Sequence, residues 1–393
     1  MKRFALIVLG LAATAPAVAE TNFSGYLKSY LVIQDEISNP IFQADRTYQS
    51  QNSGRFMIES FQDNVVLQMH YEVSPVFVSQ GIAVQNPTFN VVGDSYRLTD
   101  IEASLSDEDD KNQIYQNLDR LNVQIRLDAG DVTIGRQAIS FGAARVINPT
   151  DVFLPFNVQT FNTEYRTGVD AVRFQRPWGD LGEVDVGIVL GDDAKRETSA
   201  AFVQLRNNID GKDINFALIE YAEQTLVGAG IQSELGDMGF WFEAAYTDGD
   251  VDYVRASTGL DYAFTENTFG QIEFHYNGAG SHQPEDYLAQ LTTRPYQRGG
   301  VFLLGENYLM PSLSVQASPL WTIGIQAIIN LDDDSAFTSI SLEYNVAENF
   351  YMDFGVYIFS GDDLSAGGFG QPVFQSEYGA NPSSLYTSLR WYF

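Results

Sequence analysis

The sequence has no cysteine among its 393 residues, so disulfide bonds contribute nothing to its stability. It has no run of eighteen apolar residues, which excludes a transmembrane helix. Basic residues are scarce, since 22 Lys and Arg stand against 51 Asp and Glu, for a formal net charge of −29. A chain this acidic has no electrostatic footprint for phosphates, which excludes nucleic acid as a partner.

The first residues are typical of a secretory signal peptide. Residues 1–3 carry positive charge, residues 4–15 are mostly apolar, and Ala17 and Ala19 fit a small-residue cleavage site. We expect residues 1–19 to be removed and residues 20–393 to form one domain, a barrel that begins at Glu20. An exported protein of this size without disulfides needs another source of stability, and a closed barrel in lipid provides one.

The last residues, 383–393, alternate as a strand with one apolar and one polar face. Leu385, Leu389, Trp391 and Phe393 fall on the apolar face, and the segment is long enough to cross a bilayer as a tilted strand. A final strand that ends on an aromatic residue resembles the C-terminal assembly signal of Gram-negative outer-membrane β-barrels. This resemblance implies that Phe393 is the assembly signal and that barrel-assembly machinery is a partner. It also implies that the last strand pairs with the first, which leaves no free edge in lipid.

The same alternation recurs along the chain, in segments joined by short and long connections. We expect short turns near residues 63, 129, 180, 210, 237, 266, 319 and 348. They predict an all-β fold, a transmembrane antiparallel up-and-down β-barrel of about 18 strands, with 16 strands as the alternative. The 27 Phe, 21 Tyr and 4 Trp suit aromatic girdles, and a mean hydropathy of −0.14 suits strands that are polar at every second position.

After residue 119 the pattern leaves two points to be settled, the parity of one strand and the position of one long connection. Residues 119–128 predict a strand with Leu121 outward and Arg126 toward the lumen, but Ile139 and Phe141 break the parity of the next strand. We therefore expect a bulge near Gly135. The connection at residues 138–165 has two alternatives: it folds inward and narrows the lumen, or it packs outside on its neighbours.

Residues 131–174 contain Gly135-Arg136-Gln137 and later Val169-Asp170-Ala171-Val172-Arg173-Phe174. This stretch resembles the corresponding part of alginate-export-type and related porin-like barrels, and the resemblance implies an 18-stranded channel without fixing its solute. We therefore expect an outer-membrane, porin-like channel of a Gram-negative bacterium for passive diffusion of small hydrophilic solutes, anionic ones included. Two alternatives stay open: export of an acidic polysaccharide, and a structural or adhesive barrel without transport.

The same part of the chain is locally basic. Arginines on neighbouring strands would give the lumen a positive track that selects anions, because the low-dielectric wall strengthens each charge. Alternatively, they pair with acidic residues across strands, for which the candidates are Asp128, Asp131, Asp151, Glu164 and Asp170. The predicted pore-lining residues are Arg126, Arg136, Arg145, Arg166 and Arg173.

Catalytic and metal-binding functions find little support. Of the three histidines, His70 and His275 have lumen parity and His282 falls in a loop beside Ser281, and no G-x-S-x-G motif or metal-spaced His pair appears. We expect no enzyme activity, no metal site and no cofactor. Acidic runs such as residues 107–110 are expected to be solvated loops, since none has EF-hand spacing. The expected partners are outer-membrane lipid, lipopolysaccharide and small solutes, and the sequence gives no indication of the oligomeric state.

Overall fold

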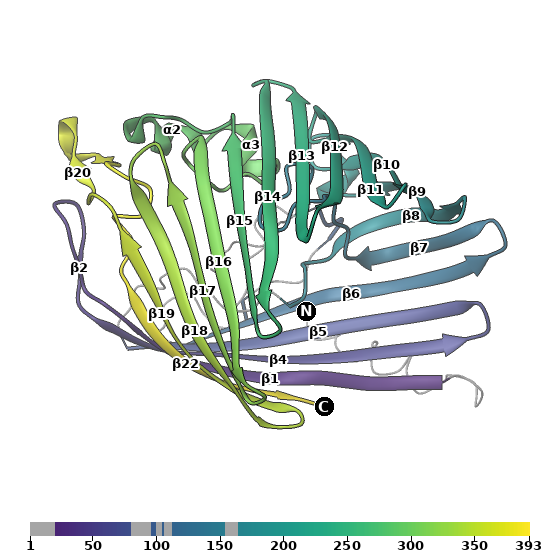
Figure 1. Ribbon diagram of the computed structural model, residues 1–393, viewed down its shortest axis with the longest axis horizontal. Coiled ribbons are helices and arrows are strands. Elements are labelled where there is room, and N and C mark those ends of the chain that lie inside the picture. Colours follow the sequence, from purple (N-terminus) through teal and green to yellow (C-terminus); the bar gives the residue numbers. More distant parts are fainter. Residues whose placement is uncertain (1–19, 80–95, 100–103, 106–111, 154–163) are drawn as a thin grey trace.

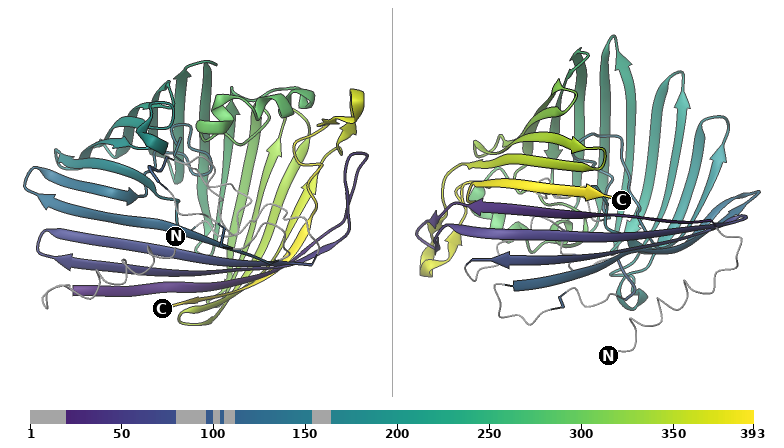
Figure 2. Two further views of the ribbon diagram at one scale, coloured as in Figure 1. Left: turned by 180° about the vertical axis from the view of Figure 1, so that it is seen from behind. Right: turned by 90° about the horizontal axis from the view of Figure 1, so that it is seen from below.

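The period-2 alternation of the sequence becomes a closed ring of 18 antiparallel strands. Each strand of the ring pairs with the next along the chain, and the last, β22 (Ser384–Tyr392), pairs with the first, β1 (Glu20–Gln34). Figures 1 and 2 show the ring in the computed structural model from three directions. The structure describes residues 20–79, 96–99, 104–105, 112–153 and 164–393. The expected leader and the acidic run at 107–110 lie outside these residues.

The other strands of the ring, in chain order, are β4 (Thr47–Gln62), β5 (Val65–Val78), β6 (Asn112–Leu127), β7 (Gly130–Gln137), β8 (Val169–Trp178), β9 (Gly182–Val189), β10 (Ala200–Ile209), β11 (Lys212–Tyr221), β12 (Gln224–Leu235), β13 (Met238–Asp248), β14 (Tyr253–Thr265), β15 (Thr268–Asn277), β16 (Asn307–Ser318), β17 (Trp321–Asn330), β18 (Ser335–Ala347) and β19 (Phe350–Ser360). The connections carry the small elements β2 (Ile37–Ser38), β3 (Gln43–Ala44), η2 (Asp192–Ala194), η3 (Pro284–Asp286), α2 (Tyr287–Gln290), α3 (Arg294–Arg298), β20 (Ser365–Ala366), η4 (Gly368–Gly370) and β21 (Pro372–Val373).

The predicted barrel of 18 strands is confirmed, and the alternative of 16 strands is wrong. All eight expected short turns lie between consecutive strands of the ring. Asp63 and Asp210 adopt φ values of 50° and 52° in two of these turns. Asp tolerates this left-handed conformation better than most residues with a side chain, which is why the turns are visible in the sequence.

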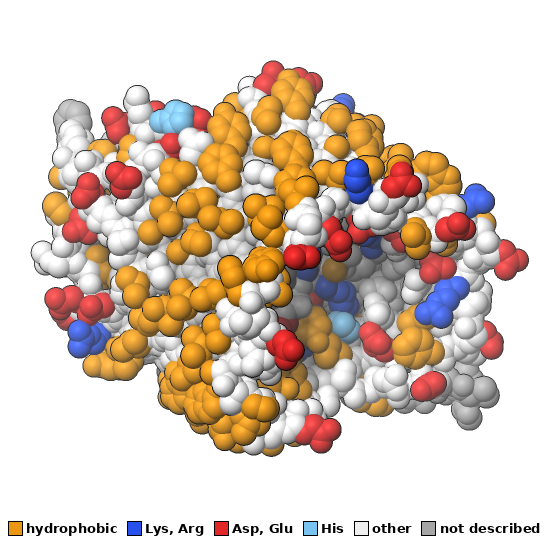
Figure 3. All heavy atoms as spheres, viewed as in Figure 1, with side chains coloured by type: hydrophobic (Ala, Val, Ile, Leu, Met, Phe, Trp, Pro, Cys, Tyr) orange, Lys and Arg blue, Asp and Glu red, His pale blue; other side chains and the backbone are white. Residues whose placement is uncertain are grey.

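Apolar side chains cover the outside of the ring. Phe23, Leu31 and Leu385 are each more than half exposed, and Leu389 and Trp391 share the outward face of β22 as expected. Figure 3 shows hydrophobic side chains gathered over the outer face of the strands on one side of the barrel. An apolar outer band of this kind matches the hydrocarbon layer of a bilayer. No helix among the described residues is long and apolar enough to span a membrane.

The expected bulge near Gly135 is wrong, because β7 keeps one register across this residue with both β6 and β8. Gly135 instead has a φ of 114°, which residues with a side chain avoid. Past this point Arg136 and Gln137 are both buried. Ile139 and Phe141 lie beyond the end of β7, in a segment that enters the lumen, so their parity does not belong to a strand.

A register shift does occur in β6, one strand earlier. His70 pairs with Arg120 and Tyr71 pairs with Leu118, so Asp119 is an extra residue in β6. Such a bulge turns neighbouring side chains to the same face. As a result, Asp119 and Arg120 are both buried in the barrel interior.

The ring closes at a contact between Gly25 and Phe393. Their backbones exchange two hydrogen bonds, of 2.9 and 3.1 Å. The Phe393 ring lies so close to Gly25 that a Cβ atom there would come within 2.7 Å of its Cζ atom. The ring centroids of Phe56 and Trp391 lie 6.3 and 5.2 Å from that of Phe393. Because Gly25 has no side chain, the Phe393 ring packs directly against the first strand.

We predict that Phe393→Lys and Gly25→Leu each lower the amount of folded barrel in membranes. Either change removes the aromatic packing at the closing seam, worth about 2 kcal/mol. The measurement is heat-modifiable migration on gels, which separates folded from unfolded barrel. Phe264→Lys is the matched control, since Phe264 is an exposed aromatic near a short turn but away from the seam. Equal amounts of folded barrel for Phe393→Lys and the control would show that the seam contact is dispensable.

Candidate functional site

The connection that follows β7 enters the lumen, which settles the choice between the two predicted positions for it. Glu243, on β13, faces inward and is fully buried. Its carboxylate accepts the backbone N–H groups of Ala143, Ala144 and Thr150 at 2.5, 2.9 and 2.8 Å, and also the Thr150 hydroxyl at 2.7 Å. Hydrogen bonds to a charged acceptor are stronger than neutral ones, so this contact fixes the segment against the wall.

A second inward carboxylate, Glu273 on β15, binds the next turn of the same segment. It accepts the backbone N–H groups of Arg145, Val146 and Ile147 at 3.0, 3.1 and 2.8 Å. The indole N–H of Trp241 donates to it as well, at 2.8 Å. Together the two carboxylates satisfy six backbone N–H groups that would otherwise lie unpaired inside the barrel.

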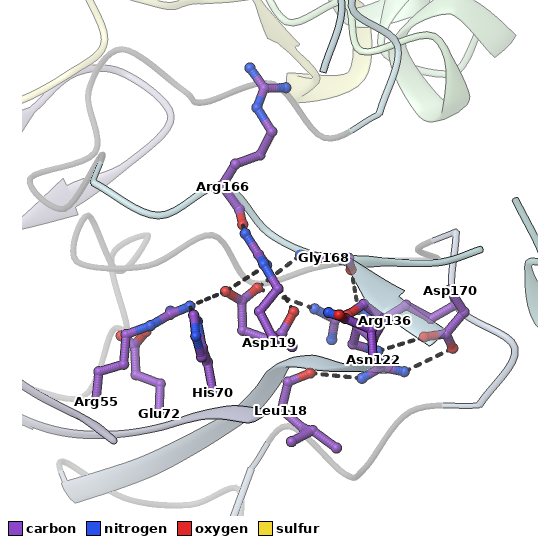
Figure 4. A network of polar contacts seen from close by, with 12 residues as sticks. Arg55, His70, Glu72, Leu118, Asp119, Asn122, Arg136, Arg166, Gly168 and Asp170 are labelled. Carbon is purple, nitrogen blue, oxygen red and sulfur yellow. Dashed lines mark hydrogen bonds and ion pairs between the residues drawn. The ribbon is translucent and has the colours of Figure 1, made fainter. Parts of the chain in front are cut away.

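The end of this connection is held at the opposite side of the ring (Figure 4). The backbone N–H of Gly168 donates to the Asp119 carboxylate at 2.8 Å, and that carboxylate also pairs with Arg55. Glu164 lies 2.8 Å from the Lys28 ammonium group on β1. The described parts of the connection thus contact both β13–β15 and β1–β6, so it crosses the lumen.

Two apolar clusters fill further parts of the interior. The first packs the inward segment against β8–β13, and the second packs it against β16–β19. Their aromatic members are Tyr96, Phe141, Phe153, Phe202, Tyr221, Tyr308, Phe337, Tyr357 and Tyr378. The lumen is therefore not an open tube, and what remains is a passage between the clusters.

That passage contains a cavity of about 600 Å³. The inward segment supplies Arg145 and Arg166 on one side, and Arg255 comes from β14. Strands β15 to β18 supply the other side with small polar side chains. The arginines of the cavity thus come from the inward segment and β14, and uncharged polar side chains come from β15 to β18.

The described residues that line the cavity include three arginines but one carboxylate, Asp151. Asp151 pairs with Arg166, and Arg145 lies 3.7 Å from Asp261. Arg255 is buried, and among the described residues it has no ion pair. Its Nε has no hydrogen-bond partner among the described residues, and the carboxylate with which it interacts electrostatically is Asp151, which Arg166 also pairs. On the described lining, positive charge therefore exceeds negative charge.

The other predicted arginines lie elsewhere. Arg136 pairs with Asp170 at 2.8 Å, and Arg173 pairs with Asp185 at 2.5 Å. Arg126 is exposed at the short-turn end of β6, on the face opposite the outward leucines. The structure thus brings together Arg145 and Arg166 and adds Arg255, which the sequence analysis missed. Its position in β14, at the parity of buried Tyr253 and Ser257, was the available signal.

Neither His275 nor His282 is placed to activate a serine hydroxyl. His275 Nδ1 lies 2.8 Å from the Ser257 hydroxyl, but that hydroxyl donates to the Ile147 carbonyl at 2.6 Å, so the imidazole does not activate it. His282 is exposed and lies between Glu306 and Asp332. Within the part of the chain that the structure describes, no group of three or more His, Asp or Glu side chains is placed to hold a metal ion.

At the loop end of the barrel, Glu377 joins three connections. Its carboxylate accepts hydrogen bonds from the Tyr308 hydroxyl, from Asn330 Nδ2 at 2.9 Å and from the Leu304 N–H at 3.1 Å. Its own N–H donates to Asp333 at 2.8 Å. Burial, and to a lesser extent the charge of Asp333, raise the pKa of Glu377 to about 7.

We predict that Glu243→Gln with Glu273→Gln widens the passage. Each amide would present an NH₂ group to backbone N–H donors, and a lost charged hydrogen bond costs about 2 kcal/mol. Single-channel conductance should rise as the inward segment leaves the wall. Glu59→Gln is the control, because Glu59 is bonded to Gln68 and does not contact the segment. A conductance equal to wild type would show that other contacts hold the segment in place.

We predict that the contact at Glu377 weakens as pH rises through about 7. The pKa of Glu377 in the folded protein is raised, because burial and the charge of Asp333 disfavour the ionised form more than its hydrogen bonds favour it. The stabilisation is therefore complete at acidic pH and is lost as the carboxyl ionises. Proteolysis of the connection at residues 361–383 should be faster at pH 8.5 than at pH 5.5. Glu377→Gln should remove this difference, whereas Asp363→Asn, at an exposed carboxylate of the same connection, should keep it. A pH-independent cleavage rate in wild type would contradict the prediction.

Comparison with known proteins supports the fold. No family model matches the chain, and no curated protein matches its sequence. Among solved structures, OpdQ of Pseudomonas aeruginosa has a TM-score of 0.59 at 9% identity, over 95% of this chain and 97% of that chain. OccAB4 of Acinetobacter baumannii has a TM-score of 0.58 at 9% identity, over 96% of this chain and 100% of that chain.

The outer membrane protein OprD from Pseudomonas aeruginosa is a third match, with a TM-score of 0.52 at 11% identity, over 95% of this chain and 93% of that chain. Identity this low shows a common fold. The resemblance to alginate-export-type barrels is not tested by these matches and stays a prediction. The chain therefore has the barrel fold of the OprD and Occ outer-membrane proteins over almost its whole described length.

Proposed function

We propose that this chain is an outer-membrane channel through which small hydrophilic anions diffuse passively. The observation that carries the proposal is the cavity between the inward segment and β14–β18, with three arginines and one carboxylate on its described lining. The apolar outer band and the similarity to OprD and Occ proteins support placement in the outer membrane of a Gram-negative bacterium. The cavity volume of about 600 Å³ suits small solutes rather than a polymer.

Close charges decide the selectivity of such a passage. The acidic connections outside would favour cations, but salt screens them beyond about 8 Å at physiological ionic strength. Arg255 and Arg145 act directly at the cavity, where the low-dielectric wall strengthens their field. Arg136 and Arg173 are neutralised by Asp170 and Asp185, so their contribution is small. Arg126 is proposed as a weaker site at the short-turn end.

The same proposal names the partners of the barrel. Its outer band would contact membrane lipid and lipopolysaccharide, and Phe393 would be read by the barrel-assembly machinery. Passive diffusion requires no cofactor and no catalytic step. No specific observation favours export of an acidic polysaccharide or a purely structural role. If the barrel showed no conductance, the structural role would be favoured.

We predict that Arg145→Gln with Arg255→Gln reduces anion preference. In a water-filled passage each positive charge stabilises a nearby anion by about 1 kcal/mol. This raises the local anion concentration about fivefold. The reversal potential in a KCl gradient should move toward cations, and uptake of small carboxylates should fall. Arg196→Gln removes an exposed positive charge outside the lumen and should leave both unchanged. If the double variant keeps the wild-type reversal potential, the proposed anion passage is wrong.

A further inference from the structure

The neutral side of the cavity is built from two rows of side chains that run across adjacent strands. In one row the strand register aligns Gln271, Ser312, Gln326 and Ser339, from β15 to β18. In the next row Ser314 and Ser341 flank Gly324. All six polar side chains line the cavity, and none of them carries a charge.

These six side chains have unused hydrogen-bonding capacity. None of them has a side-chain hydrogen bond to another described residue, whereas on the opposite wall Arg55 and Asp119 form an ion pair, and Asp119 also accepts the backbone N–H of Gly168. Gly324 keeps one of these hydroxyl groups accessible, because a Cβ atom at position 324 would lie 2.7 Å from the Ser341 hydroxyl. The glycine leaves that hydroxyl open to the cavity, so its partners must come from what the cavity contains.

The rows end at an apolar boundary. One step further along the same strands, Met310, Ile328 and Phe337 are buried in the second interior cluster. Toward that end of the strands the polar rows therefore stop at the cavity, whose lining also includes the three arginines. A solute that fills the cavity meets both positive charge and uncharged hydroxyl and amide groups.

We propose that the preferred solute is a polyhydroxylated monoanion, such as a sugar acid. This inference rests on the proposed anion channel. It specifies the chemistry of the part of the solute that does not contact the arginines. The anionic group contacts Arg255 and Arg145, and the hydroxyl groups of the solute replace water on the six polar side chains. An aliphatic anion of the same length leaves these side chains without partners, so it passes less readily.

The test compares gluconate with hexanoate, which has the same number of carbons and one carboxylate but no hydroxyl groups. Permeability is measured by swelling of liposomes that contain the full-length barrel. Wild type should admit gluconate at least fivefold faster than hexanoate. The combined variant Ser312→Ala, Ser314→Ala, Ser339→Ala and Ser341→Ala should lower that ratio at least threefold, because each lost hydrogen bond weakens the match to hydroxyl groups.

Two further variants make the outcome decisive. Thr338→Ala removes a hydroxyl from the outward face of β18, next to Ser339, and should leave the ratio unchanged. Ser339→Ala with Ser341→Ala serves as a smaller change if the fourfold variant gives little heat-modifiable barrel, and it should lower the ratio in the same direction. An unchanged ratio in folded serine variants, or a wild-type ratio near one, overturns the inference. The reversal potential of wild type tests anion passage separately, so each proposal can fail alone.

Discussion

The interior of this barrel depends on two carboxylates that bind a backbone. Glu243 and Glu273 accept six backbone N–H groups of the segment that follows β7, and both are fully buried. A free segment would be solvated in a water-filled lumen, but a segment packed against apolar clusters has no water to pair with. The carboxylates supply the missing acceptors. The positions of Arg145 and of the cavity follow from this contact.

The strands and turns of the barrel wall were predictable because short stretches of sequence determine them. Alternation with period two needs no knowledge of the rest of the chain, and turn residues such as Asp63 and Asp210 mark where each hairpin reverses. The outward face of the last strand, up to Phe393, followed from the same alternation. Even the inward path of the connection after β7 was among the alternatives, because its apolar residues had no place on an exposed loop.

The lumen was harder to predict, since its contacts join residues far apart in the sequence. The extra residue Asp119 is visible only through the register of β5 and β6, and the irregularity at Gly135 is a positive φ rather than an inserted residue. Arg173 was expected to line the pore, and its guanidinium pairs with Asp185 of the neighbouring strand β9. Arg255 went unnoticed because an isolated arginine in a strand carries no motif. Charge pairing is set by tertiary structure, and a single sequence does not encode it in any local pattern.

The contacts that anchor the inward segment also bear on the order in which parts of the barrel fold. Glu243 and Glu273 lie roughly 90 to 130 residues further along the chain than the amides they bind. Contacts of such separation form late, because the hairpins between them must first be in place. The pairing of β1 with β22 that closes the ring joins the two ends of the described chain, so by the same reasoning it forms later still. We therefore expect the inward segment to be seated on β13 and β15 before the ring closes, so that the closed barrel is narrow from the start.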